Sequence, residues 1–326
     1  MAIIDVHTHM FTHEYMEVLK ARGGIYNLKM RPDGQAEIFR NDTPVAIPQA
    51  GHFDYVLRLK DMDSAGIDVS VVSLTCPNVF WGDENTSSNV ARQSNASMAS
   101  AQKKWPDRIR WFASLPWEYP GRAREELKRS CDEGAVGVMV LANIAGSSLT
   151  DPCFAPIWEE IDARALPVLV HPTDLPGIEG MDMKQYDLSW SVGFMADTTI
   201  AFARIIFDGF LDLYANLKLI ASHGGGTLPY LVGRFDKGDE VELASRRRMK
   251  GKPSEYLKRI WYDCITYDAR ALNYLISIVG ADRVLFGTDY PHQVHDIKGS
   301  LANTGALPPE ISHAIRGSNA KALLRM

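Results

Sequence analysis

Histidines gather at the ends of short apolar segments in this 326-residue chain. His7 and His9 end the first such segment, and His171 ends a later one. Asp289 follows the last of them. Three imidazoles and one carboxylate suit a divalent metal ion such as Zn²⁺, with one position left open for water. Any one of these residues alone could equally be a buried structural residue, but the set predicts a metal site.

The apolar segments have the length and the β-branched content of strands. Most are apolar almost throughout, which is typical of parallel strands covered on both faces. The eight strands begin near Ile3, Val69, Ile109, Ala135, Pro167, Leu217, Ile260 and Arg283. Helical spacing occurs near residues 55–65, 87–104, 121–133, 154–164, 198–209, 228–243, 269–279 and 309–324. This alternation predicts an α/β fold, a (β/α)₈ TIM barrel.

The active site of such a barrel lies at the carboxyl ends of its strands, where the loops after the strands converge. His7 and His9 are two residues apart on a strand, so both side chains should point into the mouth of the barrel. Long insertions follow strands one and five, at residues 10–54 and 172–197, and we expect both to cover that mouth. No linker divides the chain, so residues 1–326 are predicted to form a single barrel domain.

The metal count follows from an absent lysine. Dinuclear barrel hydrolases commonly bridge two metals with a modified lysine at the end of strand four. This chain has no lysine between Lys128 and Lys184, which predicts a single divalent ion, zinc first and manganese second. Asp5 is expected to orient a ligand by a hydrogen bond rather than to bind the metal.

The composition limits the function classes. With 35 basic and 40 acidic residues and a pI near 6.0, the chain does not predict binding to nucleic acid or to an anionic membrane. No apolar run reaches the roughly 18 residues of a membrane span, and we expect no signal peptide at the start of the chain. Four cysteines without paired spacing are expected to be reduced, in a cytoplasmic small-molecule enzyme. These are Cys76, Cys131, Cys153 and Cys264.

A glycine motif follows the sixth strand, at His223-Gly224-Gly225-Gly226. It is similar to the oxyanion-hole motif of serine esterases, but the chain contains no Gly-x-Ser-x-Gly to supply a nucleophile. There is also no phosphate-binding loop for a nucleotide. The glycines are therefore expected to let the backbone approach a ligand.

As a set, the motifs resemble the amidohydrolase superfamily, in the branch of the α-amino-β-carboxymuconate-ε-semialdehyde decarboxylases. The motifs are Asp5-Val-His-Thr-His9, Met62-Asp63, Phe80-Trp81, His171-Pro172, Trp190-Ser-Val-Gly193, Ser222-His-Gly-Gly-Gly226, Val232-Gly-Arg234 and Gly287-Thr-Asp-Tyr-Pro291. The resemblance implies a mononuclear, metal-dependent, non-oxidative decarboxylase. It implies that His7, His9, His171 and Asp289 are the metal ligands. His223 would be the acid/base residue, and Asp289 could also carry a proton.

The chain departs from this family in its substrate contacts. Ala46 stands where the family has an arginine that grips the substrate carboxylate, and Arg40 stands where it has a lysine. Arg40 could take part of the anion-binding role or be a solvated loop residue. His292 replaces an aromatic residue. These changes predict a substrate other than the semialdehyde.

The resemblance further implies a homodimer, in which Arg234 reaches the active site of the neighbouring subunit and pairs with a substrate carboxylate. A structural ion pair is the competing interpretation of Arg234. Trp190 could stack on a planar substrate or simply pack.

Three function classes follow. The first is a decarboxylase of a small planar unsaturated or aromatic carboxylic acid. The second is a hydrolase or hydratase that acts on a lactone, amide or enol at the same mononuclear site. The third, a non-catalytic binding protein, is disfavoured because the ligand set and the base are complete.

Overall fold

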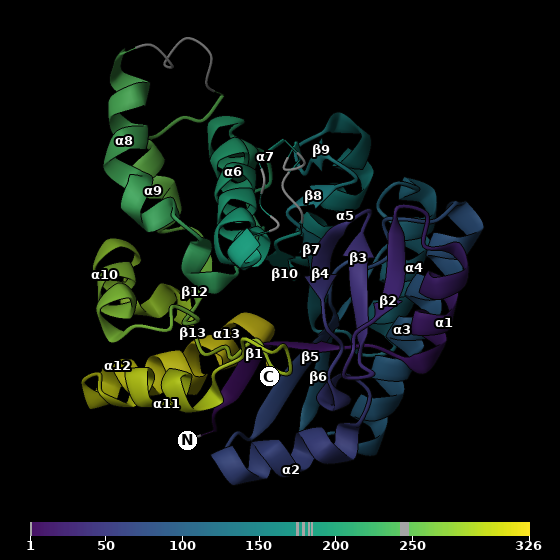
Figure 1. Ribbon diagram of the computed structural model, residues 1–326. Coiled ribbons are helices and arrows are strands. Elements are labelled where there is room, and N and C mark those ends of the chain that lie inside the picture. Colours follow the sequence, from purple (N-terminus) through teal and green to yellow (C-terminus); the bar gives the residue numbers. More distant parts are fainter. Residues whose placement is uncertain (1, 174–175, 178–179, 182, 184, 242–247) are drawn as a thin grey trace.

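Eight short apolar segments pair as parallel strands of one sheet in a computed structural model (Figure 1). The structure describes residues 2–173, 176–177, 180–181, 183, 185–241 and 248–326. The strands, in sheet order, are β1 (Ile4–Met10), β5 (Val69–Leu74), β6 (Ile109–Ala113), β7 (Gly137–Leu141), β10 (Pro167–His171), β11 (Lys218–Ala221), β12 (Trp261–Asp263) and β13 (Val284–Leu285). In β5, β6, β7 and β10, every residue except one is buried. This burial is expected of parallel strands that are covered on both faces.

The sheet closes between its first strand and the segment around its last. The Val6 amide donates to the Phe286 carbonyl at 3.0 Å, and the His9 amide donates to the Tyr290 carbonyl at 2.7 Å. The predicted (β/α)₈ barrel is therefore confirmed. It also means that the residues after β13 are held beside His7 and His9, which is where a shared site requires them.

Helices follow the strands in the predicted alternation. They are α2 (Tyr55–Ala65), α3 (Glu84–Lys104), α4 (Pro120–Asp132), α5 (Ala155–Arg164), α6 (Phe194–Phe207), α8 (Leu228–Val241), α10 (Ala269–Val279), and the final α12 (Pro309–His313) and α13 (Asn319–Leu324) joined by a π-helical turn. Shorter helices are α7 (Phe210–Leu213), α9 (Pro253–Leu257) and α11 (Ile297–Gly305). Aspartates cap several of them: Asp54 accepts from the first amides of α2, and Asp268 does the same for α10.

The first insertion is more ordered than the sequence indicated. After α1 (His13–Arg22), residues 26–46 form an antiparallel sheet of β2 (Tyr26–Met30), β3 (Ala36–Arg40) and β4 (Thr43–Ala46). Residues 31, 37 and 44–47 of the insertion line the cavity of the barrel, in agreement with the expected place over the mouth. The strands themselves were not predicted, because they are short, half-exposed and interrupted by Pro44, so their alternation is weak. Strand β4 of this sheet contacts Ser189–Gly193 of the second insertion.

The second insertion leads through a π-helix at Ser189–Gly193 directly into α6. Parts of it, at 174–175, 178–179, 182 and 184, lie outside the described residues. Together the π-helix and α6 form a 19-residue helical stretch, Ser189–Phe207, that is long and apolar enough to cross a membrane by composition. The sequence expectation that no segment reaches this length was therefore wrong. Nearly half of the apolar window is buried, and Phe202 and Ile205 belong to the core, as in a helix that covers a barrel.

Candidate metal centre and active site

The predicted metal-binding residues meet at the carboxyl end of the barrel. His7 and His9 lie on β1, His171 ends β10, and Asp289 lies in the loop after β13. The rings of His7, His9 and His171 are 4.7–5.2 Å apart, centroid to centroid. Each of the four residues is at most 3% exposed. The strand-end rule thus placed them correctly in space.

Hydrogen bonds fix the tautomer of two of these histidines. His7 Nδ1 lies 2.6 Å from Asp263 Oδ2, and His171 Nδ1 lies 2.8 Å from the Pro172 carbonyl. Both partners are acceptors, so each Nδ1 carries the proton and each Nε2 keeps a lone pair. His171 Nε2 is buried and has no hydrogen-bond partner among the described residues.

His9 is oriented in the same sense. Its Nδ1 lies 3.2 Å from Ser73 Oγ, and the Ser73 hydroxyl donates its one proton to the Thr8 carbonyl at 3.1 Å. Ser73 must therefore accept from His9 Nδ1–H, which leaves the lone pair on His9 Nε2. All three histidines turn an unprotonated Nε2 to the same place.

Asp289 completes this donor set. Its Oδ1 lies 3.2 Å from His9 Nε2 and 3.4 Å from His7 Nε2, and the two Nε2 atoms are 3.0 Å apart. Donors about 2 Å from one ion are spaced by about 3 Å, so these separations fit a single divalent metal. The unpartnered lone pair of His171 supports the same conclusion, since a buried acceptor without a partner is costly.

At His9, His171 and Asp289 the electrostatics favour the protonation states that a metal requires. At His7 burial would lower the pKa of the ring, but the hydrogen bond from the ring to Asp263 outweighs burial and the pKa is raised. Burial lowers the pKa of His9 and of His171 well below its ordinary value, so both rings stay neutral. Burial alone would raise the pKa of Asp289, but the surrounding histidines outweigh it and the pKa falls well below its ordinary value. Asp289 is therefore ionised. Neutral imidazoles and a carboxylate are the forms that bind metals.

Asp263, which the sequence analysis did not single out, organises the site. It ends β12 and is fully buried. Its carboxylate accepts from His7 Nδ1 and from the amides of His223 at 2.9 Å and Gly224 at 3.0 Å. Burial would raise its pKa, but the hydrogen bond from His7 outweighs that and lowers it. The strand-end rule could have identified Asp263, because it follows Ile-Trp-Tyr at the end of the seventh strand.

Asp5 forms a hydrogen bond with a proposed ligand residue, as expected, but with its main chain and not with its ring. Its carboxylate accepts from the main-chain amide of His7 at 3.2 Å and from the Thr288 hydroxyl at 2.6 Å. It therefore supports the backbone of β1, whereas Asp263 orients the His7 ring. Burial raises the pKa of Asp5 to about 7.

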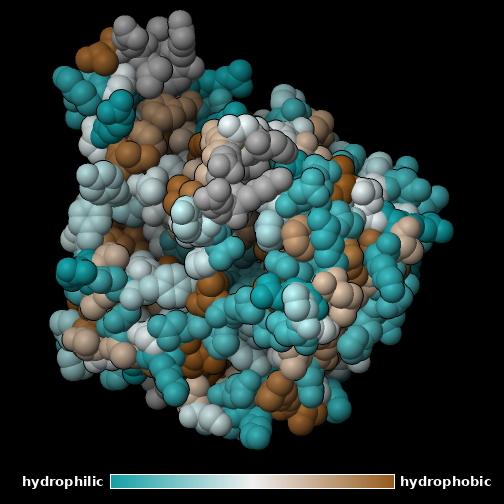
Figure 2. All heavy atoms as spheres, viewed as in Figure 1, coloured by the Kyte–Doolittle hydropathy of each residue, from teal (hydrophilic) through white to brown (hydrophobic). Residues whose placement is uncertain are grey.

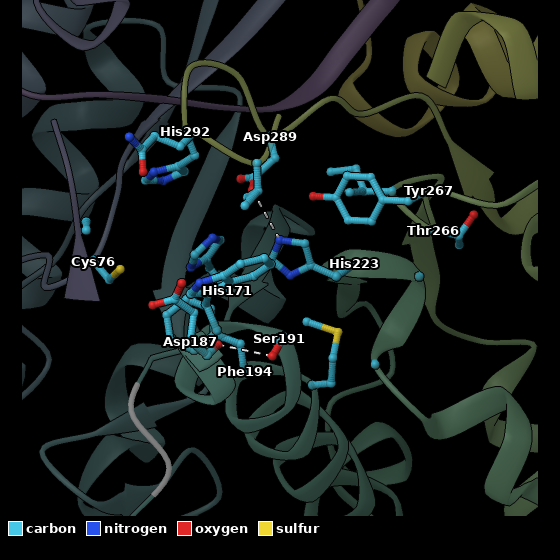
Figure 3. A pocket seen from close by; sticks show the side chains of 18 of the residues that line it. Cys76, His171, Asp187, Ser191, Phe194, His223, Thr266, Tyr267, Asp289 and His292 are labelled. Atoms are coloured by element: carbon cyan, nitrogen blue, oxygen red, sulfur yellow. Dashed lines mark hydrogen bonds and ion pairs between the residues drawn. The ribbon is translucent and has the colours of Figure 1, made fainter. Parts of the chain in front are cut away.

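His223 faces the cavity beside this donor set (Figure 3). Its Nε2 lies 3.6 Å from Asp289 Oδ2, and its Nδ1 is buried without a hydrogen-bond partner among the described residues. Its donor atom also lies within 4.8 Å of donors from His7, His171 and Asp289. The backbone of His223 has φ 53°, a left-handed conformation that is uncommon outside glycine and marks a constrained position.

A cavity of about 740 Å³ opens above these residues. His171, His223, Asp289 and His292 line its inner end, and Cys76 also lines the cavity. Apolar side chains such as Phe194, Ile265 and Leu275 form much of the wall. A planar apolar ring with a polar group directed at the histidines matches this distribution.

Two of the predicted substrate contacts line the cavity. Trp190, on the π-helix, is 42% exposed at its rim. His292 lies deeper, with Nε2 3.0 Å from Thr75 Oγ1 and its ring 4.9 Å from that of His9. Burial lowers the pKa of His292, so the ring that replaces the family's aromatic residue is neutral.

The two predicted arginines do not line the cavity. Arg40 lies on β3 outside the described lining, and Arg234 is exposed on α8 without an ion pair to any described residue. Arg31, which the sequence analysis did not select, does line it, close to the end of β2. Its guanidinium lies 3.4 Å from Glu37 and 3.5 Å from Asp33. Among the described lining residues, Arg31 alone carries a fixed positive charge.

Comparisons with known proteins agree with this geometry. Residues 4–326 match the amidohydrolase family. The chain is 28% identical to a 2-amino-3-carboxymuconate-6-semialdehyde decarboxylase of Dictyostelium discoideum, over 90% of this chain and 83% of the relative. It is 30% identical to a gamma-resorcylate decarboxylase of Rhizobium sp., over 82% and 86%. A solved dihydroxybenzoic acid decarboxylase from Polaromonas sp., with bound manganese and the inhibitor 2-nitroresorcinol, shares the fold with a TM-score of 0.83 at 23% identity, over 99% of this chain and 97% of that one.

Proposed function

The chain belongs to the amidohydrolase family, in its decarboxylase branch, and we propose that it is a metal-dependent, non-oxidative decarboxylase of a small aromatic or unsaturated carboxylic acid. The observation that carries the proposal is the position of His223. A candidate proton donor faces the cavity next to three Nε2 lone pairs and an ionised carboxylate that share one inner end. The wall above is apolar and suits a planar ring.

The proposed metal ligands are His7, His9, His171 and Asp289, holding one divalent ion. Three imidazoles with a carboxylate are donors found at zinc sites, and the manganese in the Polaromonas structure makes manganese the alternative. A divalent ion bound here would polarise the oxygens of the substrate.

His223 is the proposed proton donor to the substrate. Its Nε2 can deliver a proton to the substrate carbon that bears the carboxylate. The bond between that carbon and the carboxylate then breaks, its electron pair returns to the unsaturated system, and CO₂ departs.

We assign the binding of an anionic or polar group at the mouth to Arg31. Arg31 lines the same cavity as Ala46, the position at which the family's arginine is missing. The ion pairs of Arg31 with Glu37 and Asp33 are long, so the guanidinium retains donors for a ligand. Trp190 and His292 are proposed as further substrate contacts, and Arg40 is not.

A homodimer is the proposed assembly, with Arg234 of one subunit serving the other. Large apolar side chains are exposed on the π-helix and on α6, α7 and α8, and Figure 2 shows apolar surface over α8. They are Trp190, Val192, Ile200, Leu213, Tyr230 and Val241. Such a patch, together with Arg234, which makes no ion pair with a described residue, favours contact with a second copy. Mixing inactive Arg234→Ala and His223→Ala subunits should then restore roughly a quarter of the sites. Failure to restore any activity would refute the shared site.

The expected cytoplasmic location, with no role for nucleic acid or membrane, is also part of the proposal. It is supported by the absence of a disulfide among the four described cysteines and by the net charge of −5. Fractionation of cells with an antibody to the chain would check it.

The test of the function is a CO₂-release screen with the metal-loaded protein. The panel contains hydroxy-, amino- and nitro-substituted benzoates, with lactones and amides as the hydrolase alternative. We expect CO₂ from at least one aryl acid and none from the metal-stripped protein. Hydrolysis of a lactone without CO₂ from any acid would overturn the proposal.

A further inference from the structure

Tyr267 lies in a backbone conformation that its residue type rarely adopts. It follows β12 and has φ 57°, in the left-handed region. An aromatic residue pays a steric cost there that glycine or asparagine largely avoids. The chain on both sides is held in place: the Thr266 amide donates to the Cys264 carbonyl at 2.9 Å, and Asp268 caps α10. The surrounding structure thus imposes this conformation on Tyr267.

The Tyr267 side chain makes few stabilising contacts with the described part of the protein. Tyr267 is 50% exposed and lines the cavity. Its hydroxyl makes no hydrogen bond within the described part of the chain, and in Figure 3 it points toward the pair of Asp289 and His223. Burial of the ring and the nearby Asp289 carboxylate raise the pKa of the phenol, so the hydroxyl remains a proton donor. A donor without a partner is thus directed at the reacting end of the cavity.

We propose that Tyr267 is a substrate-binding residue whose hydroxyl donates a hydrogen bond to a carboxylate oxygen of the bound acid, beside Asp289 and His223. The inference rests on the proposed function for the identity of that acid. The strained backbone is retained because it carries the hydroxyl over the inner end of the cavity. Strained residues of this kind concentrate at ligand sites.

The first experiment removes only the hydroxyl. Binding of 2,6-dihydroxybenzoate and of its decarboxylated counterpart, resorcinol, is measured by calorimetry on metal-loaded wild type and Tyr267→Phe. A hydrogen bond to a charged oxygen predicts that the variant binds the acid about ten-fold more weakly or worse, and binds resorcinol unchanged. Equal weakening of both ligands, or of neither, would overturn the proposal. If the acid does not bind to the wild type, the proposal is also overturned. The proposed function would still stand if the protein released CO₂ from a different acid.

The second experiment tests the strain in the ligand-free protein. Asparagine tolerates the left-handed region, so Tyr267→Asn should raise the melting temperature by about 2 °C while it weakens binding of the acid. Tyr186 provides a matched control, since it has φ 59°, is 85% exposed and does not line the described cavity. Tyr186→Asn should raise the melting temperature similarly and leave binding unchanged. If Tyr267→Asn melts at or below the wild-type temperature, the proposed reason for the strain is wrong.

Discussion

The two ends of the cavity are built differently. At the inner end, His7, His9 and Asp263 are completely buried, and each ring or carboxylate is held by a hydrogen bond from another strand. At the mouth, Tyr230 is 80% exposed and Arg31 makes only long ion pairs. The side chains of the inner end are therefore held in one conformation by hydrogen bonds between strands of the barrel. The residues at the mouth belong to the insertions and to the first turns of helices. Such segments can change in sequence without moving the proposed metal ligands.

Removal of a proposed metal ligand should have the largest effect on activity, and it would show most clearly how the inner end differs from the mouth. Asp289→Ala removes the carboxylate on which the three histidines converge, so the metal content should fall close to zero. Activity should fall on the order of a thousand-fold, since a metal supplies several kcal/mol of transition-state stabilisation. Elemental analysis and CO₂ release measure both. Asp187→Ala, which changes another cavity-lining aspartate at the exposed mouth, should keep the metal; equal losses in the two variants would contradict the assignment.

Asp263→Asn tests whether the inner end depends on its supporting residues. The amide cannot accept from His7 and from two backbone amides as the carboxylate does. We expect metal affinity to fall about 10- to 100-fold, measured by competition with a chelator. Asp5→Asn is the matched control, because Asp5 bonds the main chain of His7 and the Thr288 hydroxyl but not the His7 ring, and it should change affinity less. A larger effect at Asp5 would reverse the roles given to the two aspartates.

A smaller and more selective effect is expected at the mouth. Arg31→Ala removes the fixed positive charge of the described lining, so KM should rise about ten-fold with little change in kcat. Arg40→Ala removes the same charge from β3, outside the lining, and should leave both constants unchanged. Steady-state kinetics on the acid found in the screen distinguish them. An effect at Arg40 but not at Arg31 would restore the role first expected from the sequence.

The smallest effect concerns pH. His292 has a lowered pKa in the folded protein, so below its ordinary value of 6.5 the unfolded chain binds more protons and stability falls as the pH falls. His292→Phe removes this contribution. The metal-free variant should lose less stability than wild type between about pH 7 and about pH 5, by at most about 1.4 kcal/mol per pH unit. Urea unfolding at several pH values measures the slope, and parallel slopes would show that His292 titrates normally.

Much of the inner end could be predicted from the sequence, because it depends on local pattern. Strand-length apolar runs that end in His7, His171 and Asp289 indicate both the barrel and the edge at which these residues meet. The family resemblance is confirmed by the match over residues 4–326. Asp263 obeys the same rule, but a lone aspartate after a strand is too common to stand out.

The mouth could not be predicted in the same way. Arg31 reaches the cavity only because β2 pairs with β3 and β3 with β4, and such pairing leaves little trace in short, half-exposed segments. The left-handed backbone of Tyr267 is set by the turn after β12 and not by its own residue type. Substrate contacts therefore depended on long-range structure, whereas the metal site depended on spacing.

The central claim is that His223 transfers a proton and does not hold the metal. The most direct test measures metal content and CO₂ release on one preparation of His223→Asn, since asparagine tolerates the left-handed backbone found there. We expect one metal ion per chain, as in wild type, with CO₂ release reduced about 10²- to 10⁴-fold. A variant that has lost the metal, or one that still releases CO₂ at the wild-type rate, would contradict the account.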